Sequence, residues 1–97
     1  MTVVPEFNVT IHAPHRLQIC AMLAEVEQAE FSTIRAGIDV SESVLSKQLR
    51  TLEEAGLVKI TKATRASRQR TWASLTAAGR KAYRAHVAEL RRIVGEG

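Results

Sequence analysis

Three leucines at helical spacing mark the middle of the chain. Leu45, Leu49 and Leu52 recur on one side of a segment that Ser41 opens, and Gly56 after it supplies a C-cap signal. The pattern predicts a helix over residues 41–55.

A hairpin is predicted directly after this helix. Residues 57–61 alternate apolar and polar side chains, a turn-rich basic segment follows, and residues 71–75 contain a second strand-like run. We therefore expect two strands and a basic tip over residues 57–75.

The segment from Pro14 to Glu27 has no interior breaker, and proline suits a first helical turn, so a helix is predicted over residues 14–27. Its apolar residues occupy two sides, with Cys20 on one and Ile19 and Leu23 on the other. A helix that is apolar all round is buried all round. We expect one side to pack on the core and Ile19 and Leu23 to face a second subunit.

Shorter signals connect these elements. Phe31-Ser32-Thr33 interrupts the helical pattern and is predicted as a short strand, with Ser32 or Thr33 as the cap of a helix over residues 33–38. A short turn then leads into the helix that begins at Ser41, and two short helices joined in this way with a glycine nearby are typical of a helix-turn-helix. Residues 1–13, which contain Pro5, are predicted to form an extended or irregular arm docked on the body.

The last helix is predicted over residues 76–94, with Thr76 as N-cap. Its apolar stripe is long and narrow, which is typical of a seam between helices. The predicted dimer interface combines this stripe with one face of the first helix: Ile19, Leu23, Tyr83, Val87, Leu90 and Val94.

Length and composition place the chain in one class. Its 97 residues suit a single domain, 45% are hydrophobic and only 4% are aromatic, so the core must be aliphatic and mainly helical. The predicted fold class is α+β, mainly helical, over residues 1–97. Cys20 is the single cysteine, and neither a signal peptide nor a long uncharged apolar run occurs, so a cytoplasmic protein without membrane contact is expected.

Charge is unevenly distributed along the chain. Seven cations and three acids lie between Ser41 and Arg70, an excess equal to the whole net charge of +4, whereas the first forty residues are acidic on balance. A localised basic face indicates a nucleic-acid partner.

The predicted helix over residues 41–55 can read base edges. With the leucines inward, Arg50 and Lys47 can donate to guanine, and Gln48 can pair with adenine. Hydroxyl groups nearby can contact bases or phosphates. The alternative is an ordinary solvated helix face, since three glutamates leave the helix nearly neutral. The candidate contacts on this helix are Ser41, Ser43, Ser46, Lys47, Gln48, Arg50 and Thr51.

The hairpin tip carries the denser charge. Residues 62–70 contain four cations and no acid, whereas a tip that merely turned would favour Asn-Gly or Asp-Gly. We expect Arg65 or Arg68 to lie along the minor groove or its phosphates, with a solvated charge run as the alternative. The candidate contacts here are Lys62, Arg65, Arg68 and Arg70.

The tryptophan, the histidines and the cysteine are expected to have structural roles. Trp72 is expected to pack on the hairpin and bear on the helix rather than to stack a base. The histidines with Cys20 do not match a closed zinc site, and Cys20 fits a small core residue better than a redox switch. The sequence has neither a phosphate-cradling glycine loop nor a nucleophile elbow, so neither an enzyme nor a cofactor is expected.

Together these segments resemble small winged helix-turn-helix transcriptional regulators related to the MarR family. The resemblance lies in IHAPHRLQICAML, in FSTIRAGIDVSESVLSKQLRTLEEAGLVKI and in LTAAGRKAY, and it extends over nearly the whole chain. It implies a homodimer whose helix from Ser41 enters the major groove and whose wing is the loop from Thr64 to Arg68. Family members that sense small molecules usually have longer chains with extra dimerisation helices, so a small-molecule effector stays undecided.

The function that follows is a sequence-specific regulator of transcription. It is expected to bind an inverted-repeat operator in double-stranded DNA as a dimeric repressor. The alternatives are a winged helix used for protein–protein interaction and a sequence-neutral, chromatin-type DNA binder.

Overall fold

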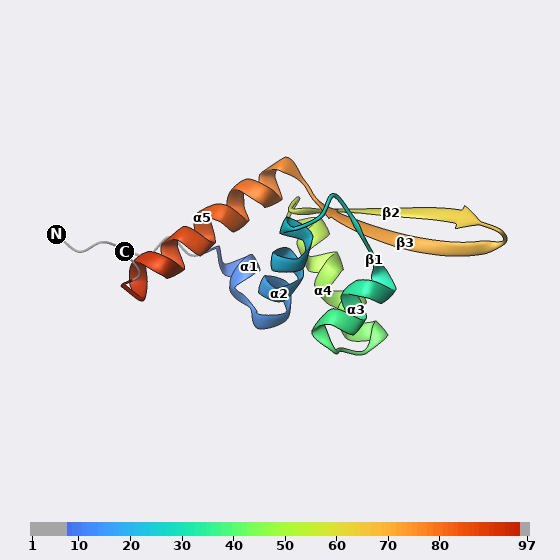
Figure 1. Cartoon of the computed structure of the whole chain (residues 1–97), viewed down its shortest axis with the longest axis horizontal. Helices are drawn as coiled ribbons and strands as arrows, with labels where there is room; N and C mark the ends of the chain where they lie inside the picture. Colours follow the sequence, from blue (N-terminus) through green and yellow to red (C-terminus); the bar gives the residue numbers. More distant parts are fainter. Residues whose placement is uncertain (1–7, 96–97) are drawn as a thin grey trace.

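The computed structural model describes residues 8–95 of the chain, and those residues form an elongated body of 59 × 25 × 22 Å (Figure 1). The helices gather into one body, the hairpin projects from one end and the last helix extends toward the other. Within residues 8–95, five helices and three strands follow in the order α1 (Val9–His12), α2 (Pro14–Ala24), β1 (Ala29–Glu30), α3 (Phe31–Ile38), α4 (Glu42–Glu54), β2 (Val58–Arg65), β3 (Arg68–Leu75) and α5 (Ala77–Ile93).

The strands form one antiparallel sheet in the order β1-β3-β2. The two long strands pair from Val58 with Leu75 out to Arg65 with Arg68, and β1 adds Ala29 beside Ala73. This arrangement of helices and a small sheet confirms the predicted winged-helix fold, in which the short strand β1 lies beside the two-stranded hairpin.

Aliphatic side chains from the helices and the base of the hairpin form one core. Ile34, Leu45 and Leu52 are completely buried, as are Ile19 and Leu23 on α2. The assignment of Ile19 and Leu23 to a dimer interface is therefore wrong. The packing of α2 against α3, α4, α5 and β3 covers both of its apolar sides within one chain, so no partner subunit can contact them.

The first helix of the helix-turn-helix begins earlier than predicted, and the turn lies at the expected residues 38–41 but uses an aspartate in place of a glycine. Helix α3 starts at Phe31, with Glu30 as N-cap, because the strand occupies Ala29–Glu30 rather than residues 31–33. The left-handed residue in the turn is Asp39, with φ of 52°, whereas Gly37 lies inside the helix. Aspartate tolerates this conformation better than most residues with a side chain.

Helix α4 is held at both ends by local signals. The Ser41 hydroxyl accepts a hydrogen bond from the Val44 N–H, which satisfies one of the free donors of the first turn. At the other end, Gly56 has φ of 77°, which suits a C-cap glycine. The expected end signals of this helix are therefore those that the structure uses.

The segment LTAAGR attaches α5 to the rest of the fold. The Thr76 hydroxyl donates to the Gly56 carbonyl over 2.7 Å and accepts from the Gly79 N–H, so it joins the C-cap of α4 to the start of α5. The Arg80 guanidinium donates to the Val26 carbonyl over 2.9 Å just beyond α2. Both contacts link segments far apart in sequence.

The N-terminal segment differs from the predicted irregular arm. Val9–His12 forms one helical turn capped by Asn8, whose side chain accepts from the Ile11 N–H. Ile11 is completely buried, and α1 packs against α2, α4 and α5. The part of the predicted arm over residues 1–7 lies outside the described residues. No helix within residues 8–95 combines the length and hydropathy needed to cross a membrane.

Candidate nucleic-acid interface

Helix α4 presents its polar face to solvent. Ser43, Ser46, Lys47 and Arg50 are all exposed, while the leucines on the opposite side are buried. These four side chains therefore occupy the outer face predicted for them. Exposed donors on the second helix of a helix-turn-helix can reach base edges in a major groove.

Three other predicted contacts on this helix have partners within the protein. The Oε1 atom of half-buried Gln48 accepts a hydrogen bond of 2.7 Å from Arg16 on α2. The Thr51 hydroxyl donates to the Lys47 carbonyl one turn earlier, and Ser41 caps the helix. The polar side chains of α4 therefore fall into two groups, one that faces solvent and one that makes hydrogen bonds within the protein.

The cations of the hairpin divide between its two faces. The β2–β3 register places Lys62 opposite Thr71, on the face that also carries Ile60 and Ala73. Arg68 and Arg70 alternate onto the other face, which carries Trp72 as well. Trp72 therefore lies on the side of the hairpin away from α4, and the expectation that it bears on that helix is wrong.

The tip of the hairpin is tighter than the predicted loop over residues 64–68. The strands continue to Arg65 and resume at Arg68, so that only Ala66 and Ser67 turn the chain, with φ of 48° and 65°. Positive φ at both central residues is the geometry of a two-residue hairpin turn, here made without glycine. For Arg65 the structure describes the backbone and not the side chain, so its predicted contact lies outside the described atoms.

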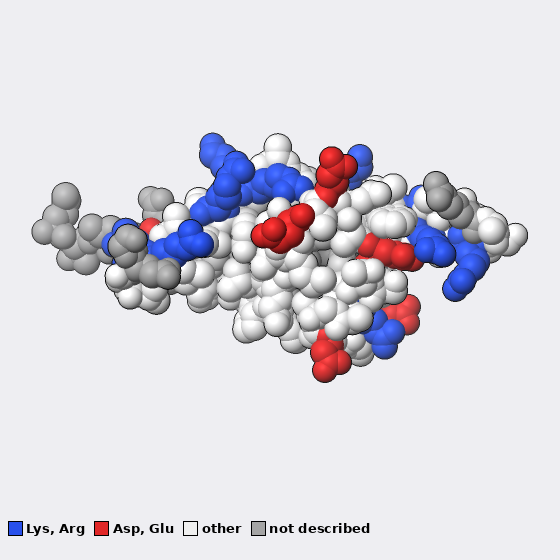
Figure 2. Space-filling model, viewed as in Figure 1, with Lys and Arg blue, Asp and Glu red and all other residues white. Residues whose placement is uncertain are grey.

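Positively charged side chains gather toward both ends of the elongated molecule. Figure 2 shows Lys and Arg over α5 and toward the hairpin tip, with acidic side chains on the helical body between them. Of α4 and the β2–β3 hairpin, the hairpin therefore carries most of the net positive charge, because the exposed cations of α4 are accompanied by exposed Glu42, Glu53 and Glu54.

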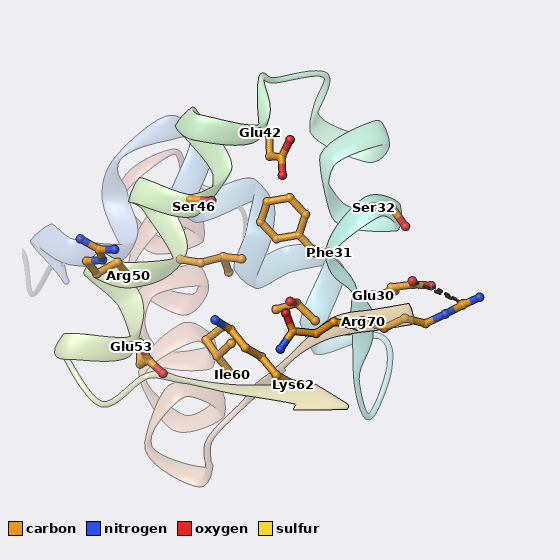
Figure 3. A pocket seen from close by; sticks show the side chains of 13 residues that line it. Glu30, Phe31, Ser32, Glu42, Ser46, Arg50, Glu53, Ile60, Lys62 and Arg70 are labelled. Atoms are coloured by element: carbon orange, nitrogen blue, oxygen red, sulfur yellow. Dashed lines mark hydrogen bonds and ion pairs between the residues drawn. The ribbon is translucent and has the colours of Figure 1, made fainter. Parts of the chain in front are cut away.

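A groove of about 450 Å³ separates α4 from the hairpin (Figure 3). Phe31 points into it from the start of α3, and Leu49 and Ile60 line it as well. Its polar lining mixes both signs of charge. Those polar side chains are Glu30, Ser32, Glu42, Ser46, Arg50, Glu53, Lys62, Gln69, Arg70 and Thr71.

An ion pair closes one side of this groove. Arg70 on β3 donates to the carboxylate of Glu30 on β1 at 3.4 Å, and both side chains retain access to solvent. Figure 3 shows this pair on the side of the groove opposite Arg50. An exposed pair of this kind contributes little stability, so a phosphate oxygen can compete with Glu30 for Arg70 at small cost.

Sequence reasoning missed two residues at this site, Arg16 and Glu30. Each contacts a predicted site residue, but the separations in sequence are 32 and 40 residues. No local periodicity connects residues that far apart, so only the tertiary fold could identify them.

The predicted dimer residues on α5 follow a gradient of exposure. Tyr83 packs against the core, Val87 and Leu90 are half-buried, and Val94 is 73% exposed. The helix thus begins as part of the core and ends with apolar side chains in solvent.

Other reactive groups fit structural roles. Burial raises the pKa of the Cys20 thiol to about 11, against a smaller opposing effect of Arg16, so the thiol stays protonated and unreactive. Within the described residues, no three His, Cys, Asp or Glu side chains gather as metal ligands.

Comparisons with known proteins agree with this geometry. The model of a family described as "Winged helix DNA-binding domain" matches residues 15–94. The chain is 28% identical over 78 residues to the uncharacterized protein MJ0432 of Methanocaldococcus jannaschii, covering 80% of this chain and 85% of that protein.

Solved structures are similar over nearly the same region. The transcriptional regulator homologue from Pyrococcus horikoshii OT3 superposes with a TM-score of 0.85 at 30% identity, covering 91% of this chain and 87% of that one. A transcriptional regulator of the MarR family from Enterococcus faecalis V583 shares the fold, with a TM-score of 0.77 at 23% identity over 90% and 77% of the two chains. The chain therefore belongs to the winged helix DNA-binding domain family and is a DNA-binding transcription regulator with the fold of MarR-family proteins.

Proposed function

We propose that this transcription regulator acts as a homodimeric repressor that binds an inverted-repeat operator in double-stranded DNA. The observation that carries the proposal is the side-by-side placement of the exposed polar face of α4 and the basic hairpin across one groove. A duplex laid over both elements would bring a major groove to α4 and a neighbouring phosphate backbone or minor groove to the hairpin. The protein would then act in the cytoplasm, at the nucleoid.

The two elements would have different tasks. Arg50 is exposed on α4 and can donate two parallel hydrogen bonds to guanine O6 and N7, which makes it the best candidate for reading sequence. Arg68 is exposed at the hairpin tip, where a cation contacts phosphates whatever the base sequence. Phosphate contacts position the protein and base contacts specify the site.

The acidic residues of α4 would reinforce this separation between base reading by α4 and phosphate contact by the hairpin. Glu42 and Glu53 line the same groove as Arg50 and Lys62. They would repel phosphates that approach the helix in a wrong register, while affinity comes chiefly from the hairpin.

Dimerisation is supported by the exposed end of α5. Val94 is 73% and Ile93 45% exposed, and Val9 on neighbouring α1 is 81% exposed. Exposed apolar side chains on two helices that pack against each other are a suitable surface for a second copy. A two-fold axis there would place the α4 helix and the hairpin of both chains against the DNA, and the half-sites of the operator would lie roughly 10 base pairs apart, centre to centre.

Selection of bound duplexes from a random pool tests the proposal directly. We expect the selected sequences to share an inverted repeat, and affinity to fall about 10³- to 10⁵-fold between 50 and 200 mM salt if six to ten phosphates are contacted. No enriched sequence with strong binding would identify a sequence-neutral DNA binder. No DNA binding would favour a winged helix that contacts proteins.

Two matched arginine variants separate reading from anchoring. Arg50→Ala should reduce preference for the selected site by about 1–3 kcal/mol while binding to random DNA survives. Arg68→Ala should weaken binding to both DNAs about equally. The reverse result in a titration would exchange the two roles.

A further inference from the structure

His86 is the buried polar side chain of the described core, with 1% of its surface exposed. It lies on α5 and faces α1, which Figure 1 shows beside α5 at the edge of the helical body. The backbone N–H of Asn8 lies 3.2 Å from His86 Nδ1, and His12 Nδ1 lies 3.1 Å from His86 Nε2. The two rings meet edge to face, with centroids 5.1 Å apart.

These contacts fix where the protons lie. A backbone N–H can only donate, so His86 Nδ1 must accept and carries no proton. Neutral His86 therefore has its proton on Nε2 and donates it to His12 Nδ1, which must be unprotonated as well. The observed arrangement requires both imidazoles to be neutral.

Helix α1, the single turn that His86 contacts, is connected to α4, the helix proposed to read the DNA sequence. In α1, Ile11 is completely buried, and the Thr10 carbonyl accepts a hydrogen bond from Arg16 Nε. The same guanidinium donates to Gln48 of α4 through Nη1. Because α1 is one turn long, it has no stability of its own and depends on these tertiary contacts.

We propose that His12 and His86 form a proton-operated latch that holds α1 closed between α5 and α4 and releases it on acidification. A second proton on His86 places a donor against the Asn8 N–H. Protonation of His86 therefore replaces a hydrogen bond by two opposed donors, so α1 leaves its site.

The direction of the pH dependence follows from burial. Burial, and after it the neighbouring His12, lower the pKa of His86 below its ordinary 6.5. The released state therefore binds protons more readily than the latched state. The latch is fully stable above pH 6.5 and loses stability as the pH falls from 6.5 toward the lowered pKa.

Two charged groups on the helices next to the pair have partners of their own. Arg16 on α2 bonds to Thr10 and Gln48, and Glu89 on α5 is bonded to Arg92. Helix α4 turns Gln48 to this side, and β3 reaches α5 at its opposite end, next to Thr76. The remaining titratable groups on α2 and α5 are His15, Cys20, Arg80, Lys81, Tyr83, Arg84 and Arg91.

Release of α1 would have two consequences. It removes the Thr10 carbonyl that orients Arg16, and so loosens Gln48 on α4. It also uncovers part of α5 beside the surface proposed for dimerisation. The expected loss of DNA binding rests on the proposed function, whereas the latch itself does not.

Nuclear magnetic resonance of the ¹⁵N-labelled full chain tests the latch between pH 8 and pH 5. At pH 7.5 we expect His86 to carry its proton on Nε2. Below pH 6.5, hydrogen-exchange protection of the Ile11 and His12 amides should fall together with His86 protonation, by up to about tenfold per pH unit for one linked proton. A proton on Nδ1, or protection that does not change down to pH 5, would overturn the latch.

His12→Gln keeps an acceptor for the His86 Nε2–H, and residue 12 is exposed, so this variant should fold. Because the neighbouring His12 lowers the pKa of His86, the substitution should move the midpoint of release to higher pH. The matched control His15→Gln removes another α1-proximal histidine and should leave the midpoint where it is. Equal midpoints for the wild type and His12→Gln would contradict the role of His12.

DNA affinity at pH 7.5 and pH 5.5, at constant ionic strength, separates this inference from the proposed function. Failure to bind DNA at either pH would remove the proposed function and leave the resonance result standing. Tight binding at both pH values, with α1 released at the lower one, would show that the latch does not regulate DNA recognition.

Discussion

Arg16 and Gln48 are joined by a 2.7 Å hydrogen bond that ties the first long helix to the middle of the recognition helix. Arg16 lies on α2 and also bonds to the Thr10 carbonyl, so one guanidinium connects three helices. A hydrogen bond to a charged group is stronger than one between neutral groups. This contact therefore makes the orientation of α4 depend on the N-terminal part of the fold.

Loss of that contact should be measurable as stability. Arg16→Ala should lower the free energy of unfolding in urea by about 1.5–3 kcal/mol, because a charged hydrogen bond is lost. In a double-mutant cycle with Gln48→Ala, the coupling energy should be about 0.5–3 kcal/mol. Strictly additive effects would mean that the two side chains do not stabilise one another.

Removal of a negative charge from the groove should strengthen DNA binding. Glu53 lines the groove between α4 and the hairpin, where a phosphate backbone is proposed to lie. Glu53→Gln should improve affinity by about 0.2–1 kcal/mol at low salt, with a smaller gain at 200 mM salt. Fluorescence anisotropy with a labelled duplex measures both.

The neighbouring glutamate provides the control. Glu54 is exposed on the same helix but is not among the groove residues, so Glu54→Gln changes net charge equally. A gain of the same size for both variants would indicate a general charge effect rather than a local one.

A charge in the seam of α5 should separate the subunits. Leu90 is half-buried in one chain and would be covered further by a partner, so Leu90→Glu should give monomers in light scattering. Ala85→Glu places the same charge on the exposed opposite side of the helix and should leave the dimer intact. An unchanged dimer in Leu90→Glu, with helix content preserved, would move the interface elsewhere.

Substitution of Gly79 should be costly for a steric reason. A Cβ atom there would lie 2.0 Å from the Leu57 carbonyl oxygen, so the backbone after α4 would have to shift. Gly79→Ala should reduce the free energy of unfolding by about 1–3 kcal/mol, seen as a lower melting temperature.

Gly37→Ala is the matched control in another helix. There the added Cβ meets the end of the Met22 side chain, which can move aside, and alanine favours the helix by about 0.5–1 kcal/mol. A larger loss of stability at Gly37 than at Gly79 would contradict the packing described for LTAAGR.

The sequence alone determined the elements that depend on local periodicity and end signals. The leucine stripe of α4, its Ser41 cap and its glycine end are properties of neighbouring residues, and all three appear in the structure. The helix-turn-helix followed by a basic hairpin could be predicted for the same reason. The sequence therefore predicts the elements between Ser41 and Arg70 that are proposed to contact DNA.

Tertiary structure decided which candidate side chains remain available for binding. Spacing placed Ile19, Leu23 and Gln48 on apolar or polar faces, but burial in one chain covers the first two, and Arg16 engages the third. The partners that decide this lie in other elements of the fold, 32 residues away in the case of Arg16 and Gln48, and helical periodicity cannot register them.

The N-terminal turn illustrates the difference most clearly. Four residues with prolines nearby have no local reason to form a helix, so the sequence predicted an irregular arm. Contacts with α2, α4 and α5, including the hydrogen bond from Asn8 to His86, supply the stability that local propensity lacks. The sequence by itself determined what can be a helix or a strand, and only the packing decided which faces are buried, held or left for a partner.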